Sequence, residues 1–141
     1  MMKPKLTHIA LHVENLARCV AFYQKYCRLQ VVHQREKRNK QVVWMAEPGR
    51  EHEFVMVFLE GGPLHEPVAN DFSHLGFAVA SKSEVDAIAL KAKGEGVLVW
   101  PAVQDHYPVG YYCGLVDPNG NYVEFSYGQP LGPGSENMAF G

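Results

Sequence analysis

The sequence predicts an α+β fold built from two copies of one strand–helix–strand–strand–strand module. The first observation is a repeat: residues 7–13 (THIALHV) recur as residues 73–79 (SHLGFAV). The second is that a helical pattern follows each copy, and three β-rich segments follow each helix. Because a repeated unit usually packs against its copy, we expect two paired βαβββ modules within one domain spanning residues 1–141.

The first module is expected over about residues 5–61. Residues 6–13 alternate in polarity, which predicts a strand with His8 and His12 on the face opposite Ile9. From Asn15, a candidate N-cap, apolar residues recur at steps of three and four, which predicts a helix. Three more strands are predicted at residues 29–34, 41–46 and 54–59.

A polar, proline-bearing linker over about residues 62–72 separates the modules. The second module is expected over about residues 73–128, and its strands at residues 73–80, 97–100, 111–116 and 121–127. Ser81 and Glu84 have the spacing of a capping box at the start of its helix, and Gly94 is the expected helix end. Residues 129–141 form a tail rich in glycine and proline, outside both modules.

Composition narrows the class of partner and the compartment. Hydrophobic residues make up 47% of the chain, charged residues 20%, and the net charge is −2. This balance fits a soluble globular protein and gives no sign of a nucleic-acid or membrane partner. Three cysteines without paired spacing fit a reducing compartment, and no apolar run reaches the ~18–20 residues of a membrane span. A cytoplasmic protein is therefore expected.

An acidic residue in an apolar strand is the third informative feature. Glu124 lies within Tyr-Val-Glu-Phe, and matching Gly61 to Gly128 places it opposite Val57 of the first module. A buried carboxylate needs a cation or hydrogen-bond donors, since leaving it unpaired costs several kcal/mol.

His8 and His74 occupy equivalent positions in the two copies. A lone strand histidine is more often structural, but the joint pattern of His8, His74 and Glu124 favours a divalent metal site. Three protein ligands of this kind leave coordination positions open for water or substrate.

Three motifs resemble those of the vicinal oxygen chelate superfamily, which includes glyoxalase I, extradiol dioxygenases, fosfomycin-resistance enzymes and bleomycin-resistance proteins. They are Thr7-His8-Ile9 with the following Asn15-Leu16 and Ala21-Phe22-Tyr23, then residues 73–77, and Asp-Pro-Asn-Gly-Asn-Tyr-Val-Glu at residues 117–124. The resemblance implies that the modules form an eight-stranded cup-shaped sheet with flanking helices around a divalent metal. It implies His8, His74 and Glu124 as ligands of Fe, Mn, Ni or Zn, a small oxygen-chelating substrate, and a homodimer.

Departures from the family pattern bear on the reaction. Glyoxalase I has a fourth ligand where this chain has Val57, and Glu53 and Glu60 are out of register with that position. Extradiol dioxygenases place a tyrosine where this chain has Gly114. Fosfomycin enzymes hold a phosphonate with basic residues, of which few are well placed here.

Three candidate catalytic residues are predicted. His106 has the spacing of the extradiol histidine and is a candidate acid–base residue, and Tyr112 shares a strand face with Gly114. Glu124 is the third.

Two functions therefore remain open from the sequence. The first is a metal-dependent enzyme with dioxygenase-like or glyoxalase-like lyase or isomerase activity. The alternative is a metal-free protein that binds a small molecule, as bleomycin-resistance proteins do.

Overall fold

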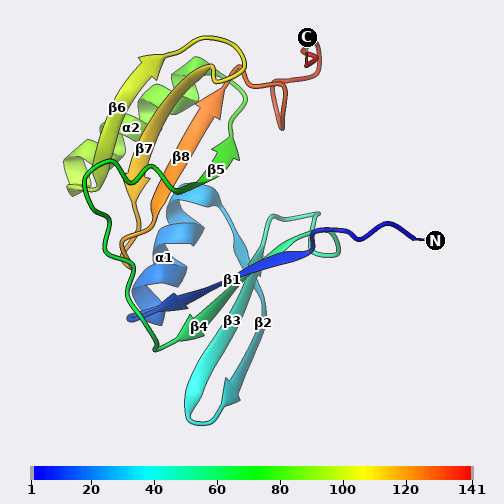
Figure 1. Ribbon diagram of the computed structural model, residues 1–141, viewed down its shortest axis with the longest axis vertical. Coiled ribbons are helices and arrows are strands. Elements are labelled where there is room, and N and C mark those ends of the chain that lie inside the picture. Colours follow the sequence, from blue (N-terminus) through cyan, green and yellow to red (C-terminus); the bar gives the residue numbers. More distant parts are fainter. Residues whose placement is uncertain (1, 141) are drawn as a thin grey trace. The chain divides into compact units, whose positions relative to one another are not determined.

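The computed structural model describes residues 2–140 and contains both expected modules (Figure 1). The elements of the first are β1 (His8–Val13), α1 (Leu16–Cys27), β2 (Gln30–Lys37), β3 (Lys40–Ala46) and β4 (Val55–Glu60). Those of the second are β5 (His74–Ala78), α2 (Lys82–Glu95), β6 (Leu98–Gln104), β7 (Tyr111–Val116) and β8 (Tyr122–Tyr127). The α+β class, the two βαβββ modules and all eight predicted strands are thus confirmed.

The chain divides into two compact units, and the boundary lies between His65 and Glu66, inside the predicted linker. That the two units form one domain stays a prediction. Among residues 2–140, neither helix has the length and apolar character needed to cross a membrane.

The two sheets have the same strand order. In the first unit it is β1-β4-β3-β2, and in the second it is β5-β8-β7-β6. The first strand of each unit pairs in parallel with the last, so that Ala10 lies beside Val57 and Gly76 lies beside Glu124. This register confirms the predicted equivalence of Val57 and Glu124.

Both helices begin at the predicted caps. The side chain of Asn15 accepts a hydrogen bond from the Arg18 backbone N–H at 3.0 Å. The Ser81 hydroxyl accepts from the Glu84 N–H at 3.2 Å, while the Glu84 carboxylate accepts from the N–H of Ala80 at 2.9 Å. In the usual capping box the acidic side chain accepts from the N–H of the N-cap residue, here Ser81, whereas Glu84 accepts from the residue before it.

The predicted end of the second helix was wrong by two residues. Gly94 is helical, and α2 continues to Glu95. The C-cap is Gly96, whose φ of 75° is left-handed and whose N–H bonds the carbonyl oxygens of Ala92 and Lys93. A glycine in the left-handed region is a stronger stop than one that can adopt helical angles.

Each helix covers one face of its own sheet. In the first unit, the ring of Tyr23 on α1 packs against Phe58 of β4, with ring centroids 5.1 Å apart. In the second, the Cys113 thiol of β7 points to α2 and donates to the Val85 carbonyl at 3.8 Å. Because side chains alternate along a strand, Val57 and Glu124 lie on the sheet faces that the helices do not cover.

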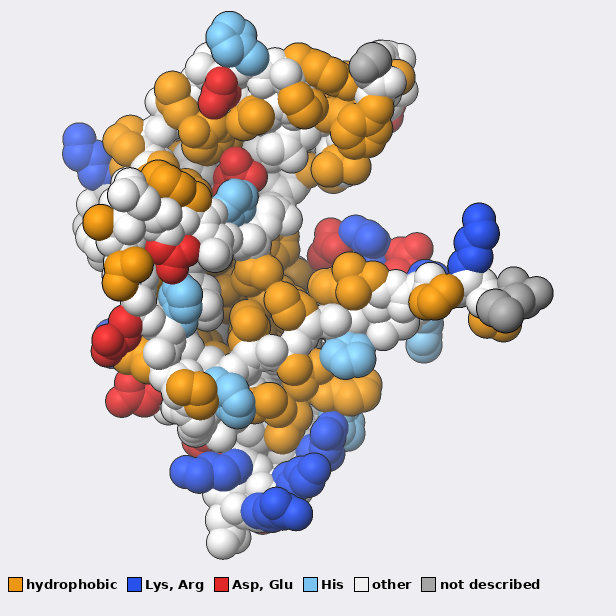
Figure 2. All heavy atoms as spheres, in the orientation of Figure 1, with side chains coloured by type: hydrophobic (Ala, Val, Ile, Leu, Met, Phe, Trp, Pro, Cys, Tyr) orange, Lys and Arg blue, Asp and Glu red, His pale blue; other side chains and the backbone are white. Residues whose placement is uncertain are grey.

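Two segments outside the helices and strands have a defined conformation: the turn between β2 and β3 and the C-terminal tail. The β2–β3 hairpin turns through Arg38 and Asn39, both with positive φ, and Figure 2 shows basic side chains gathered around it. The tail packs on the second unit: the Tyr107 hydroxyl donates to the Ala139 carbonyl. A side chain at Gly132 would approach the Cβ of Ala78 to 2.5 Å.

Candidate metal and substrate site

The second unit brings His74 and Glu124 together on adjacent strands. The Nε2 atom of His74, the first residue of β5, lies 3.5 Å from Oε2 of Glu124 on β8. The His74 side chain is 36% exposed, while that of Glu124 is only 10% exposed. A half-exposed imidazole beside a buried carboxylate is an arrangement that can hold a divalent cation at the end of a sheet.

The orientation of the His74 ring is fixed through its other nitrogen. Nδ1 lies 2.6 Å from the backbone carbonyl oxygen of Phe72, so Nδ1 carries the proton and donates it to that oxygen. The lone pair of a neutral His74 is then on Nε2, the atom that faces Glu124. A carbonyl that holds the far side of an imidazole is the usual outer contact of a metal-binding histidine.

The Glu124 carboxylate lies in an environment that disfavours its charge. Burial raises the pKa of Glu124, and the nearby His74 and a hydrogen bond from Gln129 offset only part of this rise. The charge is therefore incompletely compensated by the described residues. A bound cation would supply the missing compensation.

Two of the four residues in one row across the second sheet are glycines. Trp100, Gly114, Glu124 and Gly76 are successive neighbours from β6 to β5. The Trp100 indole occupies the place of a Gly114 side chain, since a Cβ there would lie 2.2 Å from the indole Cε3. The same indole meets the His74 ring edge-on, with centroids 5.6 Å apart. Trp100 therefore forms a wall beside the His74–Glu124 pair.

His8 holds the equivalent position in the first unit. It begins β1, is exposed, and its Nδ1 lies 3.0 Å from the Thr7 hydroxyl oxygen. Its neighbours on the uncovered face are Ala10 on the same strand and Val55, its partner on β4, while Val57 is the partner of Ala10. This unit has no carboxylate at the Glu124 position, because Val57 stands there. Glu53 and Glu60 do not replace it: Glu53 pairs with Arg50, and Glu60 accepts from the Gln41 N–H.

The predicted three-ligand set is therefore seen in two parts. His74 and Glu124 are brought together, and His8 is described within the other unit. Among residues 2–140, no group of three or more histidine, cysteine, aspartate or glutamate side chains is assembled for a metal. His8 as the third ligand stays a prediction. The donor chemistry of the His74–Glu124 pair itself fits a divalent metal.

The two other predicted catalytic residues lie in different places. Tyr112 alternates with Cys113 and shares the face of Gly114 and Glu124, as predicted. His106 lies in the β6–β7 loop, beyond the end of the sheet that lies opposite His74. From Gly114 to Tyr111 alone the strand extends ~10 Å, at ~3.3 Å per residue. The structure does not bring His106 to Glu124 within this unit, and its role stays a prediction.

Three features of this site are not evident from the sequence: the Phe72 carbonyl, the Gln129 amide and the contact of Trp100 with Gly114. Phe72 acts through its backbone, so its side chain gives no signal. Gln129 belongs to the tail, which carries no periodic pattern. The glycine at position 114 was the available signal for Trp100, since a glycine within a strand often marks close approach of another group.

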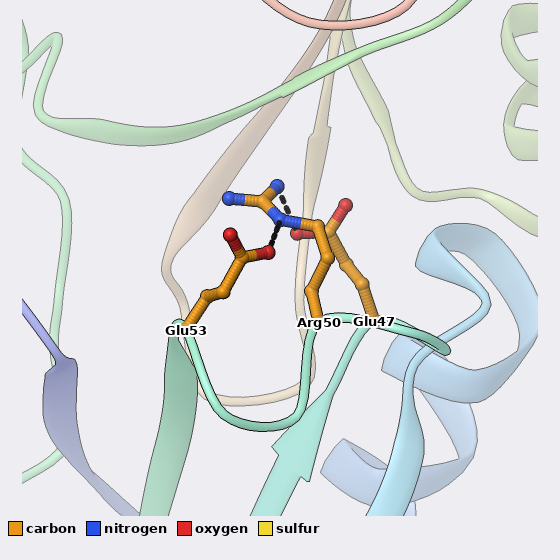
Figure 3. A network of polar contacts seen from close by, with 3 residues as sticks. All are labelled: Glu47, Arg50 and Glu53. Carbon is orange, nitrogen blue, oxygen red and sulfur yellow. Dashed lines mark hydrogen bonds and ion pairs between the residues drawn. The ribbon is translucent and has the colours of Figure 1, made fainter.

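The first unit has a hollow of about 370 Å³ on its uncovered face. Its apolar wall comes from β3 and β4, and His8, Arg35 and Glu53 also line it. Figure 3 shows that Arg50 lies between Glu47 and Glu53 in the loop that precedes β4. Its Nη1 atom lies 2.7 Å from Oε2 of Glu47, and its Nε atom lies 3.0 Å from Oε2 of Glu53. The carboxylate of Glu53 is thus paired within the loop.

A comparison with known protein families agrees with this architecture. The Glyoxalase/Bleomycin resistance protein/Dioxygenase superfamily matches residues 5–125, which is most of the chain. The chain belongs to this superfamily. The resemblance predicted from the three motifs is thereby confirmed.

Among individual relatives, the uncharacterized protein PA2024 of Pseudomonas aeruginosa is 55% identical over 137 residues, covering 97% of this chain and 98% of that protein. Among solved structures, the fosfomycin resistance protein FosX of Listeria monocytogenes is 22% identical with a TM-score of 0.70, covering 89% and 94% of the two chains. A possible glyoxalase from Bacillus cereus is 21% identical with a TM-score of 0.65, covering 86% and 96%. At this identity the structural likeness shows a shared fold.

Proposed function

We propose that this protein is a divalent-metal-dependent enzyme of the superfamily that acts on a small, oxygen-chelating substrate. The observation that carries the proposal is the His74–Glu124 pair, with its 3.5 Å separation and the Phe72 carbonyl behind the imidazole. His74, Glu124 and His8 would hold the metal. The chelating substrate would occupy the positions that three protein ligands leave open.

The site residues have separate tasks in this proposal. The Phe72 carbonyl keeps the His74 proton on Nδ1, so that Nε2 presents its lone pair. The Gln129 amide holds the Glu124 carboxylate, and the Trp100 indole prevents the His74 ring from turning toward β6. When bound, the metal supplies Lewis acidity that stabilises negative charge on substrate oxygens.

Support for a divalent metal also comes from the fold relatives. FosX has been crystallised with Mn(II) and sulfate, and a variant of it with Mn(II) and 1S,2S-dihydroxypropylphosphonic acid. Mn(II) is one of the four metals expected from the sequence, and Fe(II), Ni(II) and Zn(II) are to be tested beside it, because imidazole and carboxylate ligands accept all four.

Two reactions remain within the proposal. Val57 at the fourth-ligand position favours three-ligand, dioxygenase-like chemistry, for which Tyr112 and His106 would be the substrate-contacting hydroxyl and the acid–base residue. Glyoxalase-like lyase or isomerase activity is the other. Oxygen consumption with catechols and Fe(II) identifies the first, and loss of a glutathione hemithioacetal with Ni(II) or Zn(II) identifies the second.

Metal binding tests the proposal directly. Protein stripped with a chelator is titrated with Mn(II), Fe(II), Ni(II) and Zn(II), and the bound metal is counted. We expect one metal per chain, and a loss of affinity of about 100-fold or more in His74→Ala, His8→Ala and Glu124→Gln. His12→Ala, on the same strand face as His8, is the matched control and keeps wild-type affinity. Equal affinity in all five proteins contradicts the proposal.

The second candidate is a metal-free binding protein, and the hollow in the first unit is the observation that favours it. Such a protein would bind its small-molecule ligand equally well after replacement of His74 and Glu124, which do not line the hollow. The double variant His74→Ala, Glu124→Gln is the deciding protein: full ligand affinity supports the binding protein, and lost affinity supports the metal enzyme. Assembly as a homodimer and a cytoplasmic location are further proposals, checked by sedimentation and by cell fractionation.

A further inference from the structure

A residue that lines the hollow of the first unit has a buried hydrogen-bond donor without a partner. The indole Nε1–H of Trp44, on β3, is buried and bonds to no described atom. Buried N–H groups are nearly always paired, so an orphaned one calls for a physical reason. Trp44 also lines the hollow, together with Val55 and Val57 of β4. An acceptor supplied from outside the chain would satisfy this group.

A cation lies beside the same indole. The guanidinium carbon of Arg35, on β2, lies 5.6 Å from the centre of the Trp44 ring. Among the described residues Arg35 has no carboxylate partner, so its five N–H donors are available to a ligand. Guanidinium groups stacked on aromatic rings commonly bind carboxylates in a bidentate manner.

Two acidic residues lie at the edge of the hollow and oppose an anion. Glu53 is already paired with Arg50, which removes most of its effect. Glu51 is exposed, so water screens its charge. The remaining wall is apolar, from Trp44, Val55 and Val57. A ligand that suits this lining has a planar or compact apolar body and one anionic oxygen group.

We infer that the hollow of the first unit binds a small organic acid, whose carboxylate or similar oxyanion is held by Arg35 and the Trp44 N–H. The apolar body of the acid packs on Trp44, Val55 and Val57. In taking this acid for the substrate, the inference rests on the proposed function and names its substrate class. The binding itself is testable without metal, so its failure is distinguishable from a failure of metal binding.

The test uses metal-free protein in chelator, with benzoate as the probe and benzamide as its uncharged analogue. The chain has two tryptophans, so a ¹H–¹⁵N spectrum contains two indole signals, and Trp44→Phe identifies that of Trp44. We expect benzoate to shift the Trp44 signal saturably and to bind at least about tenfold more tightly than benzamide. A Trp44 signal that does not move at saturating benzoate overturns the inference, as does equal binding of the two probes.

Charge variants locate the anion. Arg35→Gln should abolish the preference for benzoate, while Lys37→Gln, two residues along the same strand and outside the lining, should keep it. Glu51→Gln should leave benzoate affinity unchanged or raise it. A preference that survives in Arg35→Gln, or is lost equally in Lys37→Gln, contradicts the assignment.

Trp44→Phe adds a test in which the melting temperature should rise while the affinity for benzoate falls. A six-membered aromatic ring is kept, and the five-membered ring that carries the unsatisfied donor is removed. We expect relief of the unpaired N–H to outweigh the lost packing, so the ligand-free variant should melt about 2–5 °C higher than the wild type. The same variant should bind benzoate about tenfold more weakly. If the melting temperature falls and benzoate affinity is unchanged, the N–H has no role in binding and the inference is wrong.

Discussion

Val57 and Glu124 occupy the same position in the two sheets. Val57 lies between Ala10 and Trp44, and Glu124 lies between Gly76 and Gly114. The same scaffold therefore carries an apolar residue in one unit and a buried carboxylate in the other. Because the valine is accommodated without any polar partner, the carboxylate is not required by the fold. Under the proposed function, a cation bound by Glu124 would explain its presence in the second unit.

The first prediction concerns Glu124 and pH. Burial raises the pKa of Glu124 in the folded, metal-free protein above its ordinary value of 4.5. Below that value the group is protonated in both folded and unfolded chains and has no effect on stability. As pH rises from there through the raised pKa, the unfolded chain loses the proton first, so the folded state loses stability.

Glu124→Gln lacks this ionisation. Its free energy of unfolding, relative to the wild type, should therefore increase as pH rises from 4 to 7. Urea unfolding of both proteins in chelator at several pH values measures the difference. Parallel pH profiles would show that the carboxylate is not destabilised by burial.

The second prediction concerns the contact of Gly114 with Trp100. A methyl group at position 114 would enter the indole ring, so Gly114→Ala should cost about 1–3 kcal/mol of stability. In a Trp100→Leu background the obstacle is smaller, and the cost of the same change should fall by about half or more. A double-mutant cycle by chemical denaturation gives the coupling. Additive costs would mean that Trp100 does not occupy this space in solution.

The third prediction separates two glycines of α2. Gly94 is helical with open space around its missing side chain, so Gly94→Ala should stabilise the protein by about 0.4–1 kcal/mol. Gly96 has a φ of 75°, so Gly96→Ala should destabilise it by about 1 kcal/mol. Thermal unfolding of the two variants gives the signs. If Gly94→Ala destabilised the protein and Gly96→Ala stabilised it, the helix would end at Gly94 instead.

The fourth prediction concerns the tail. Gln129 contacts the Glu124 carboxylate, so Gln129→Ala should weaken metal binding by about tenfold and leave the fold intact. Metal titration with far-ultraviolet circular dichroism as the control measures both. Gln104→Ala, on β6, is a matched amide deletion that should have no effect on metal affinity. Unchanged affinity in Gln129→Ala would assign the tail a structural role alone.

The fold was largely predictable because its determinants are local. Single segments show the alternation in the strands and the caps at Asn15 and Ser81. The repeat is visible when two such segments are compared. The turn at residues 117–121 is another local case: the buried Asp117 carboxylate accepts the backbone N–H groups of Asn119 and Asn121, at 2.8 and 2.9 Å.

The surroundings of the site were not predictable in the same way. The Phe72 carbonyl contributes backbone, and the Trp100–Gly114 contact joins an edge strand whose pairing with β7 shifts register on both sides of Trp100. Alternation along one strand cannot reveal either. The two-residue error at Gly94 has a related cause, since sequence does not state which of two nearby glycines adopts positive φ.

The most direct test of the metal site is a crystal of the protein soaked in Mn(II), with anomalous difference density measured at the manganese edge. We predict one strong peak per chain, at ~2.0–2.3 Å from both Nε2 of His74 and a carboxylate oxygen of Glu124, with His8 as the third protein ligand. The same peak should vanish in Glu124→Gln crystals. A peak coordinated only by other side chains would contradict the account. So would the absence of a peak after a soak at saturating Mn(II) concentration.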